Sequence, residues 1–270
     1  MADELLTSTQ NPRLKALRRL RDGGRDERAD VVVIDGRREI RQALAAGLAL
    51  HELFYSRRRL QPADEDRLLR PARAAGVRLT EVSDPVLEKI CYGERHDGLV
   101  AVAERPRRRL SDLRLGPCPL LAVLESLEKP GNLGAVLRSA DAAGVEAVLV
   151  ADAATDPFGP NAIRASLGVI FCVPVVETTA AEARAWLAER GIAAVAADPA
   201  ADQIYTNVDF SGATAIVLGS EARGLTEPWR GPGVRAARVP MRGRGDSLNV
   251  SITAALFFYE ALRQRTSLLR

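Results

Sequence analysis

The sequence predicts an α/β protein with two domains, and three observations support this prediction. Short apolar runs of strand length alternate with segments of helical periodicity almost to the end of the chain. The chain has 270 residues, 47% of them hydrophobic, which is more than one small core needs. Near the middle, "RPRRRLSDLRLGPCP" replaces the periodic pattern with arginine, proline and glycine, which indicates a linker. We therefore expect domains at 1–105 and 118–270, joined by a linker at 106–117.

The first domain is expected to alternate helices and strands around a small core. Runs such as "VVVID" and "LHELFYS" combine β-branched and aromatic residues at strand length, and the segments between them carry helical periodicity. The expected strands are 31–35, 50–56, 77–82 and 98–104, and the expected helices are 11–21, 37–46, 63–75 and a short one from Pro85.

The second domain is expected to contain a parallel sheet. Its apolar runs consist of Val, Ile, Leu and Ala without alternating polar residues, which is typical of strands buried on both faces. Ligands of such sheets bind where strands end and loops begin, so these loops are the candidate site. The expected strands are 120–126, 147–152, 173–177, 192–198, 213–221 and 235–241, and the expected helices are 133–143, 159–167, 180–190 and 249–265.

Arginines gather in the first 110 residues although the net charge is only +3. The clusters include Arg18 with Arg19, Arg57 with Arg58, and residues 107–109. A solvated helix face or linker explains any single cluster, but three together favour contact with a phosphate backbone. We therefore expect RNA as a partner, with Arg18, Arg19, Arg57 and Arg58 among the contacts.

Several classes of protein are disfavoured by what the chain contains. Its three cysteines and two histidines are far apart, so spacing assembles neither a disulfide framework nor a metal site. The N-terminal stretch does not read as a secretion signal, and the apolar runs are strand-sized rather than membrane-spanning. We expect a cytoplasmic protein with no metal and no membrane partner.

Three strand-end loops of the second domain carry most of the chemistry. "EKPGNLGAVLRS" contains Asn132 and, further into a helix, Arg138; "LGSEARGL" contains Glu221; "MRGRGDSLNV" places Ser247 and Asn249 where the closing helix begins. Taken alone, each has a structural explanation as a turn residue, a first-turn carboxylate or a helix cap, and we expect Asp246 or Ser247 to cap that helix. None of the loops has a phosphate-loop or dinucleotide-binding pattern.

Taken together and in this order, the three loops resemble the motif set of the SpoU (TrmH-like) branch of the SPOUT methyltransferases, which methylate the ribose 2′-hydroxyl of RNA. The matching segments are "EKPGNLGAVLRSADAAG", "IVLGSEARGL" and "VPMRGRGDSLNVSITAAL", within residues 118–265. The resemblance implies a deep trefoil knot, S-adenosyl-L-methionine as the methyl donor, and a homodimer formed through the C-terminal domain. The first domain resembles an L30e-like RNA-binding domain in "IDGRREIRQALAAG" and "LEKIC".

The resemblance also implies which residues form the donor pocket. We expect Gly219 to leave room for the ligand, Val239 and Leu248 to form apolar walls, and the loop at 241–248 to fold over the ligand. The expected donor-binding residues are Leu218, Gly219, Val239, Met241, Ser247 and Leu248.

In the family, the arginine that matches Arg138 is the favoured catalytic residue and is sometimes described as the base. Because a guanidinium stays protonated in proteins, we expect Arg138 instead to bind an RNA phosphate and to stabilise negative charge on the 2′-oxygen. Asn132 is expected to orient Arg138 or the ribose. Glu221 is expected to hold the second motif or to contact Asn249 or Ser247, and Asn249 is expected to fix its own loop. The candidate catalytic residues are thus Arg138, Asn132, Glu221, Ser247 and Asn249.

The predicted function is ribose 2′-O-methylation of RNA, with 23S ribosomal RNA favoured. Transfer RNA is the alternative substrate, but transfer-RNA enzymes of this type often lack a separate L30e-like domain. A different class of function is a non-catalytic RNA- or ribosome-binding protein with a degenerate donor pocket, and the intact motif residues count against it. Antibiotic-resistance methyltransferases share this layout, and the sequence does not separate them from housekeeping enzymes.

Overall fold

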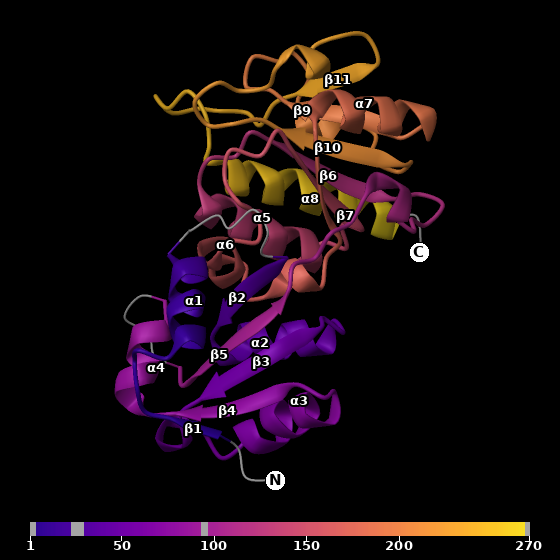
Figure 1. Cartoon of the computed structure of the whole chain (residues 1–270). Helices are drawn as coiled ribbons and strands as arrows, with labels where there is room; N and C mark the ends of the chain where they lie inside the picture. Colours follow the sequence, from indigo (N-terminus) through magenta and orange to yellow (C-terminus); the bar gives the residue numbers. More distant parts are fainter. Residues whose placement is uncertain (1–3, 23–29, 93–96, 268–270) are drawn as a thin grey trace. The chain divides into compact units, whose positions relative to one another are not determined.

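The computed structural model describes residues 4–22, 30–92 and 97–267 (Figure 1). Contacts divide the chain into two compact units. One unit comprises Met1–Pro106 and Phe158–Cys172, and the other comprises Arg107–Pro157 and Val173–Arg270. Residues 158–172, which we expected within the range 118–270, therefore group with the first unit.

The first unit contains a mixed five-stranded sheet in the order β1-β4-β3-β5-β2. Strand β5 is antiparallel to both β2 and β3, whereas β4 is parallel to β3 and β1. The three-residue strand β1 was missed, because "ELL" is too short to show any periodicity. The strands are β1 (Glu4–Leu6), β2 (Val31–Asp35), β3 (Leu50–Tyr55), β4 (Arg78–Val82) and β5 (Leu99–Glu104).

Helices of the first unit begin and end close to the expected residues, with one exception. The expected helix at 63–75 is a π-helical turn followed by a short α-helix, because Pro71 has no N–H to donate to the carbonyl of Arg67. The helical segments are α1 (Pro12–Arg21), α2 (Arg37–Ala45), η1 (Arg57–Arg59), η2 (Glu65–Leu69), α3 (Arg70–Ala74) and α4 (Asp84–Ile90).

Three contacts hold residues 158–172 in the first unit. Within this segment, which includes α6 (Pro160–Ala165) and η4 (Val169–Phe171), Arg164 donates a hydrogen bond to the carbonyl of Tyr92. The guanidinium of Arg105 stacks over the Phe158 ring at 5.1 Å from its centroid. Gly168 lies against the backbone of α2, where a Cβ would come within 2.8 Å of the Cα of Glu39. Only glycine allows this approach.

The second unit contains a six-stranded sheet in the order β11-β9-β10-β6-β7-β8, and every pair in it is parallel. This confirms the predicted α/β class and the predicted parallel sheet. All carboxyl ends of the strands consequently share one edge. The strands are β6 (Leu120–Glu125), β7 (Ala147–Ala151), β8 (Val175–Thr178), β9 (Ala193–Ala197), β10 (Thr214–Leu218) and β11 (Val234–Ala237).

Helices cover both faces of this sheet. Alternate strand residues such as Leu121 and Val123 pack with Trp186 of α7 (Ala180–Glu189) on one face. Helix α8 (Val250–Ser267) contacts β10 and packs against α5 (Pro130–Ala142), as Figure 1 shows. In the described residues, no helix is long and apolar enough to cross a membrane.

The start and the end of α8 are both fixed by side-chain hydrogen bonds. At the start, Asn249 Oδ1 accepts from the backbone N–H of Ser251 at 2.9 Å, so Asn249 is the cap, and the expectation that Asp246 or Ser247 caps this helix is wrong. Near the end, Arg265 donates to four backbone carbonyls. These belong to Cys118, Pro119, Phe210 and Gly212.

Candidate functional site

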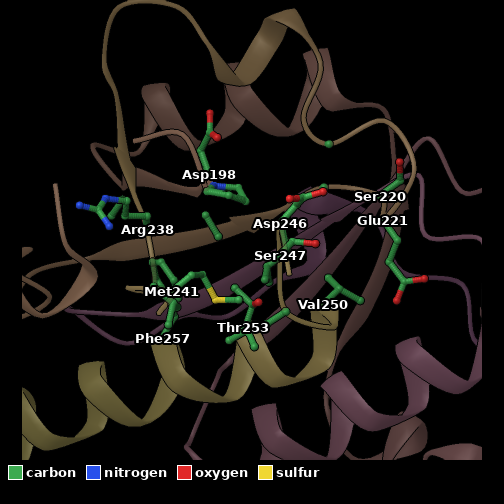
Figure 2. Close-up of a pocket in the computed structure, with 18 residues that line it drawn as sticks. Asp198, Ser220, Glu221, Arg238, Met241, Asp246, Ser247, Val250, Thr253 and Phe257 are labelled. Carbon is green, nitrogen blue, oxygen red and sulfur yellow. The ribbon is translucent and has the colours of Figure 1, made fainter. Parts of the chain in front are cut away.

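A cavity of about 290 Å³ opens at the carboxyl ends of β9, β10 and β11, beside the start of α8 (Figure 2). Its size lies at the lower end of the range for small-molecule sites, which is roughly 300–1,000 Å³. Its location follows from the parallel sheet, which brings the loops after neighbouring strands together.

All six residues predicted to bind the donor line this cavity: Leu218, Gly219, Val239, Met241, Ser247 and Leu248. Leu218 ends β10, and Leu248 lies two residues before the start of α8. Phe257 of α8 adds an apolar wall that we did not predict, because it lies in the helix rather than in a motif loop. Figure 2 shows the Met241 side chain close to Thr253 and Phe257.

Carboxylates outnumber guanidinium groups along the cavity. Asp198 after β9, Asp246 before α8 and Glu221 after β10 all line it, together with Arg238. In Figure 2 the guanidinium of Arg238 points away from the other labelled side chains. The cavity therefore suits a ligand that combines an apolar ring with positive charge.

Gly219 has a different role from the one we expected. A Cβ at this position would lie 2.4 Å from the carbonyl carbon of Gly224 and 2.7 Å from the backbone nitrogen of Leu225. The space beside Gly219 is thus filled by the returning loop and is not left for a ligand. The same loop is closed by a hydrogen bond from the N–H of Arg223 to Ser220 Oγ at 3.0 Å. The glycine is required for this tight return.

A buried carboxylate anchors the far end of that loop. Glu125 at the end of β6 is fully buried and accepts two hydrogen bonds from Thr226, from its N–H at 2.9 Å and from its hydroxyl at 2.5 Å. Because burying a carboxylate is unfavourable without such partners, this pair fixes where the loop rejoins the sheet. The sequence carried no signal for this contact, which joins residues 101 apart in the chain.

The three motif loops meet in a polar cluster beside the cavity. Glu221 Oε1 accepts from Asn132 Nδ2 at 2.6 Å and from Asn249 Nδ2 at 3.0 Å, and Asn249 Nδ2 also lies 3.2 Å from Asn132 Oδ1. Each of these residues comes from a different motif. The expected contact between Glu221 and Asn249 is therefore present, and Asn132, which was expected to orient Arg138 or the ribose, contacts both of these residues.

Lys129 belongs to the same cluster and was missed. Its Nζ lies 2.7 Å from Glu221 Oε2. This hydrogen bond lowers the pKa of the Glu221 carboxyl and raises the pKa of Lys129. Glu221 therefore stays ionised and acts as an acceptor for three donors. Lys129 lies within the first motif segment, but its partner could not be inferred from spacing.

Arg138 lies outside both the cavity and the cluster. It is exposed on α5, six residues beyond Asn132, which corresponds to about 9 Å along the helix axis. It is not among the residues that line the cavity. Within one chain, the structure therefore brings together the predicted loop residues and the donor-binding residues, but not the predicted catalytic arginine.

The arginines predicted to bind RNA in the first unit are accessible. Arg18 and Arg19 are exposed on α1. Arg57 pairs with Glu81 at 3.1 Å but keeps 70% of its side chain exposed, and the Arg58 side chain is 87% exposed. Exposed guanidinium groups of this kind can reach phosphate oxygens.

Metal ligands are not grouped in the part of the chain that the structure describes. There, no three His, Cys, Asp or Glu side chains are arranged to hold an ion.

The fold and the cavity together define a class: a two-unit α/β protein with a cavity of small-molecule size where the strands of its parallel sheet end. Two family models match separate parts of the chain, and these parts correspond closely to the two units. Residues 119–259 match the SpoU rRNA Methylase family, and residues 4–115 match the N terminus of the thiostrepton-resistance methylases. The chain belongs to the SpoU rRNA Methylase family, which confirms the resemblance predicted from its motifs.

Individual relatives agree with this assignment. The 23S rRNA (guanosine-2'-O-)-methyltransferase RlmB of Ralstonia nicotianae is 33% identical over 81% of this chain and 89% of its own length. A solved RNA 2'-O ribose methyltransferase is 41% identical with a TM-score of 0.83, covering 97% of this chain and 99% of that one. The SpoU methyltransferase AviRb from Streptomyces viridochromogenes, solved with the cofactor AdoMet, is 30% identical with a TM-score of 0.86, covering 95% of this chain and all of that one.

Proposed function

We propose that this protein transfers a methyl group from S-adenosyl-L-methionine to a ribose 2′-hydroxyl of ribosomal RNA. The observation that carries the proposal is the convergence of three distant motif loops on one cavity, in a chain of the SpoU rRNA Methylase family. The 23S rRNA activity named for the relative from Ralstonia nicotianae supports this RNA as the substrate.

The residues of the cavity fit the donor. Leu218, Leu248 and Val250 provide apolar walls for an adenine ring, and the carboxylates of Asp198 and Asp246 suit a ligand that carries positive charge. When bound, S-adenosyl-L-methionine supplies an electrophilic methyl group on a sulfonium. The chain must then hold the ribose oxygen in line with this group and exclude competing water.

The remaining chemistry falls to the polar residues around the cavity. A ribose hydroxyl is a poor nucleophile, so negative charge that develops on its oxygen has to be stabilised. We assign this role to Arg138, which would bind an adjacent phosphate at the same time. Glu221 serves by holding Asn132 and Asn249 in position, since all its described contacts are to donors. Ser247 is exposed at the cavity and can contact the donor or the ribose.

A homodimer formed through α8 is the second part of the proposal. Ile252 and Tyr259 are 52% and 50% exposed, and with Ala255 and Leu256 they form one apolar stripe at helical spacing. Such a stripe is unusual on the surface of a monomer. Because α5 packs against α8, a dimer through this face also offers a way to bring the exposed Arg138 of one subunit towards the cavity of the other.

The dimer has a direct test. Tyr259→Arg should convert a dimer to a monomer in light scattering and remove activity. The matched control is Ala185→Arg, which adds the same charge at an exposed position of α7 and should keep both the dimer and the activity. If the Tyr259→Arg protein stays dimeric, α8 does not form the interface.

Mixed dimers of an Arg138→Ala chain and a Leu218→Glu chain should regain partial activity if the arginine acts across the interface.

The finer features of the fold are also proposals. After β10 the chain crosses to β11 at the far edge of the sheet and returns as α8, which lies against β10 and α5. This path supports the trefoil knot that the family resemblance implies.

The mixed sheet of the first unit and its match to a methylase N terminus support an L30e-like RNA-binding domain. A ribosomal RNA substrate supports a cytoplasmic location for the activity.

The test of the function is incorporation of labelled methyl groups from S-adenosyl-L-methionine into protein-free 23S rRNA, followed by mapping of alkali-resistant 2′-O-methylated positions. We expect one major site. Incorporation into transfer RNA alone would shift the substrate to the alternative. Absence of donor binding in calorimetry, together with no incorporation into either RNA, would favour the non-catalytic RNA-binding protein. Because the first unit matches thiostrepton-resistance methylases, thiostrepton susceptibility of cells that express the protein tests a resistance role.

A further inference from the structure

The segment 240–247, between β11 and α8, has two faces. All eight of its residues are exposed. Met241, Asp246 and Ser247 nevertheless line the cavity, whereas Arg242 and Arg244 do not. The side of the segment away from the cavity therefore presents two guanidinium groups to solvent.

Few contacts hold this segment to the rest of the molecule. Among the described residues, backbone hydrogen bonds stop at Arg238, whose N–H donates to the carbonyl of Gln203 at 2.9 Å, and resume at the carbonyl of Asn249. Segments with few buried contacts and exposed backbone lie at the low end of local stability. Three of the residues in this segment are instead positioned to contact whatever occupies the cavity.

A ligand in the cavity can therefore order the segment. Contacts to Met241, Asp246 and Ser247 would reduce the conformational freedom of the segment. A second ligand that binds the outer face then loses less conformational entropy, because the segment is already ordered. The outer face suits one chemistry. Arg242 and Arg244 carry positive charge, and Arg223 on the neighbouring loop after β10 is also exposed. Guanidinium groups bind phosphate oxygens strongly and release counterions from a nucleic-acid backbone.

We propose that segment 240–247 is an RNA-binding surface that is ordered by the methyl donor: Arg242 and Arg244 bind backbone phosphates, and occupation of the cavity strengthens this binding. The inference rests on the proposed function, since it takes the cavity as the donor site. By linkage, RNA that binds this surface must strengthen donor binding by the same factor. Donor and RNA would thus each favour binding of the other before transfer.

The first experiment measures the affinity of the full-length protein for a labelled fragment of 23S rRNA, with and without saturating S-adenosylhomocysteine, which cannot react. We expect at least five-fold tighter RNA binding with the ligand present, within the usual range of coupling between sites. In the Arg242→Gln/Arg244→Gln protein this coupling should fall below two-fold. The slope of log affinity against log salt should decrease in magnitude by about 1.4–1.8, as expected for two lost phosphate contacts.

The matched control is Arg230→Gln/Arg235→Gln. It removes the same charge from two exposed arginines of the same unit that do not line the cavity. The control should keep the coupling of the wild-type protein. The proposal is overturned if the Arg242→Gln/Arg244→Gln protein retains full coupling, or if the control loses as much coupling.

A second measurement follows the ordering itself. Trypsin cleaves after arginine, so the wild-type protein should be cut after Arg242 and Arg244 early in digestion, and S-adenosylhomocysteine should slow these cuts at least five-fold. Unchanged cleavage with the cavity saturated would overturn the ordering step. Calorimetry with S-adenosylhomocysteine separates the two proposals: no binding defeats the proposed function and this inference together, whereas binding without coupling defeats only the inference.

Discussion

The two units handle polar side chains in opposite ways. In the first unit, charged residues form several small groups at different places, such as Arg13 with Glu4 and Glu52, and Arg59 with Asp84 and Glu88. In the second unit, the polar residues of three distant segments gather around Glu221 beside one cavity. The first arrangement suits contact with an extended partner, and the second suits chemistry at one point.

Sheet topology contributes to this difference. In the first unit, β5 runs antiparallel to both of its neighbours, so the loop after β5 leaves at the opposite edge from the loops after β2 and β3. In the second unit all strand pairs are parallel, so the loops after β9, β10 and β11 emerge at the same edge. A parallel sheet thereby concentrates residues that are far apart in sequence, which is why ligand sites occur at this edge.

The largest expected effect separates chemistry from RNA binding. Arg138→Ala should lower kcat by about 10²–10³-fold, the usual loss when one group that stabilises an oxyanion is removed, while RNA affinity stays within two-fold. Single-turnover methylation and filter binding measure the two quantities. Arg58→Ala in the first unit, where the side chain is 87% exposed, should instead leave kcat unchanged and weaken RNA binding. An active Arg138→Ala protein would refute its catalytic assignment.

The next effect tests the tight loop at the strand-end edge. Gly219→Ala introduces a Cβ 2.4 Å from the backbone of Gly224, and we expect destabilisation of about 3 kcal/mol together with loss of donor binding. Urea unfolding and calorimetry provide the readouts. Gly212→Ala is the control, since no atom lies within 4 Å of a Cβ there. Equal effects of the two substitutions would show that the close approach at Gly219 is unimportant.

A smaller effect is expected at the anchor of the same loop. Thr226→Val removes the hydroxyl that donates to the buried Glu125, and a buried acceptor that loses its partner costs about 1–3 kcal/mol. Donor affinity should fall with stability, because the loop between Gly219 and Thr226 lines the cavity. Thr226→Ser retains the hydroxyl and should recover most of both losses. If Thr226→Ser behaves like Thr226→Val, the hydrogen bond is not what positions the loop.

The smallest effect concerns thiol reactivity in the first unit. Burial raises the pKa of the Cys91 thiol to about 12, so at pH 8 it stays protonated, and only the thiolate is nucleophilic. Iodoacetamide at pH 8 should therefore modify the exposed Cys118 and Cys172 while Cys91 remains unmodified until the protein unfolds. Mass spectrometry of tryptic peptides measures this. Early modification of Cys91 would mean that the first unit opens readily in solution.

Much of the site could be predicted from the sequence, because a motif records backbone requirements and side-chain types at fixed spacing. Six residues of the second and third motifs were predicted to bind the donor, and all of them line one cavity. Pairings between motifs could not be predicted in the same way. Lys129 with Glu221 and Glu125 with Thr226 depend on which strands are neighbours, and no local pattern records that.

Apolar periodicity predicted most strand and helix positions. It shows which side chains are buried, whichever residues they pack against. The sequence therefore determined the α/β class, the parallel second sheet and the family. Only the tertiary structure decided that residues 158–172 pack with the first unit, that Asn249 rather than Ser247 caps α8, and that Arg138 lies outside its own cavity. These outcomes depend on contacts between segments distant in the chain, and their energies belong to the pair rather than to either segment alone.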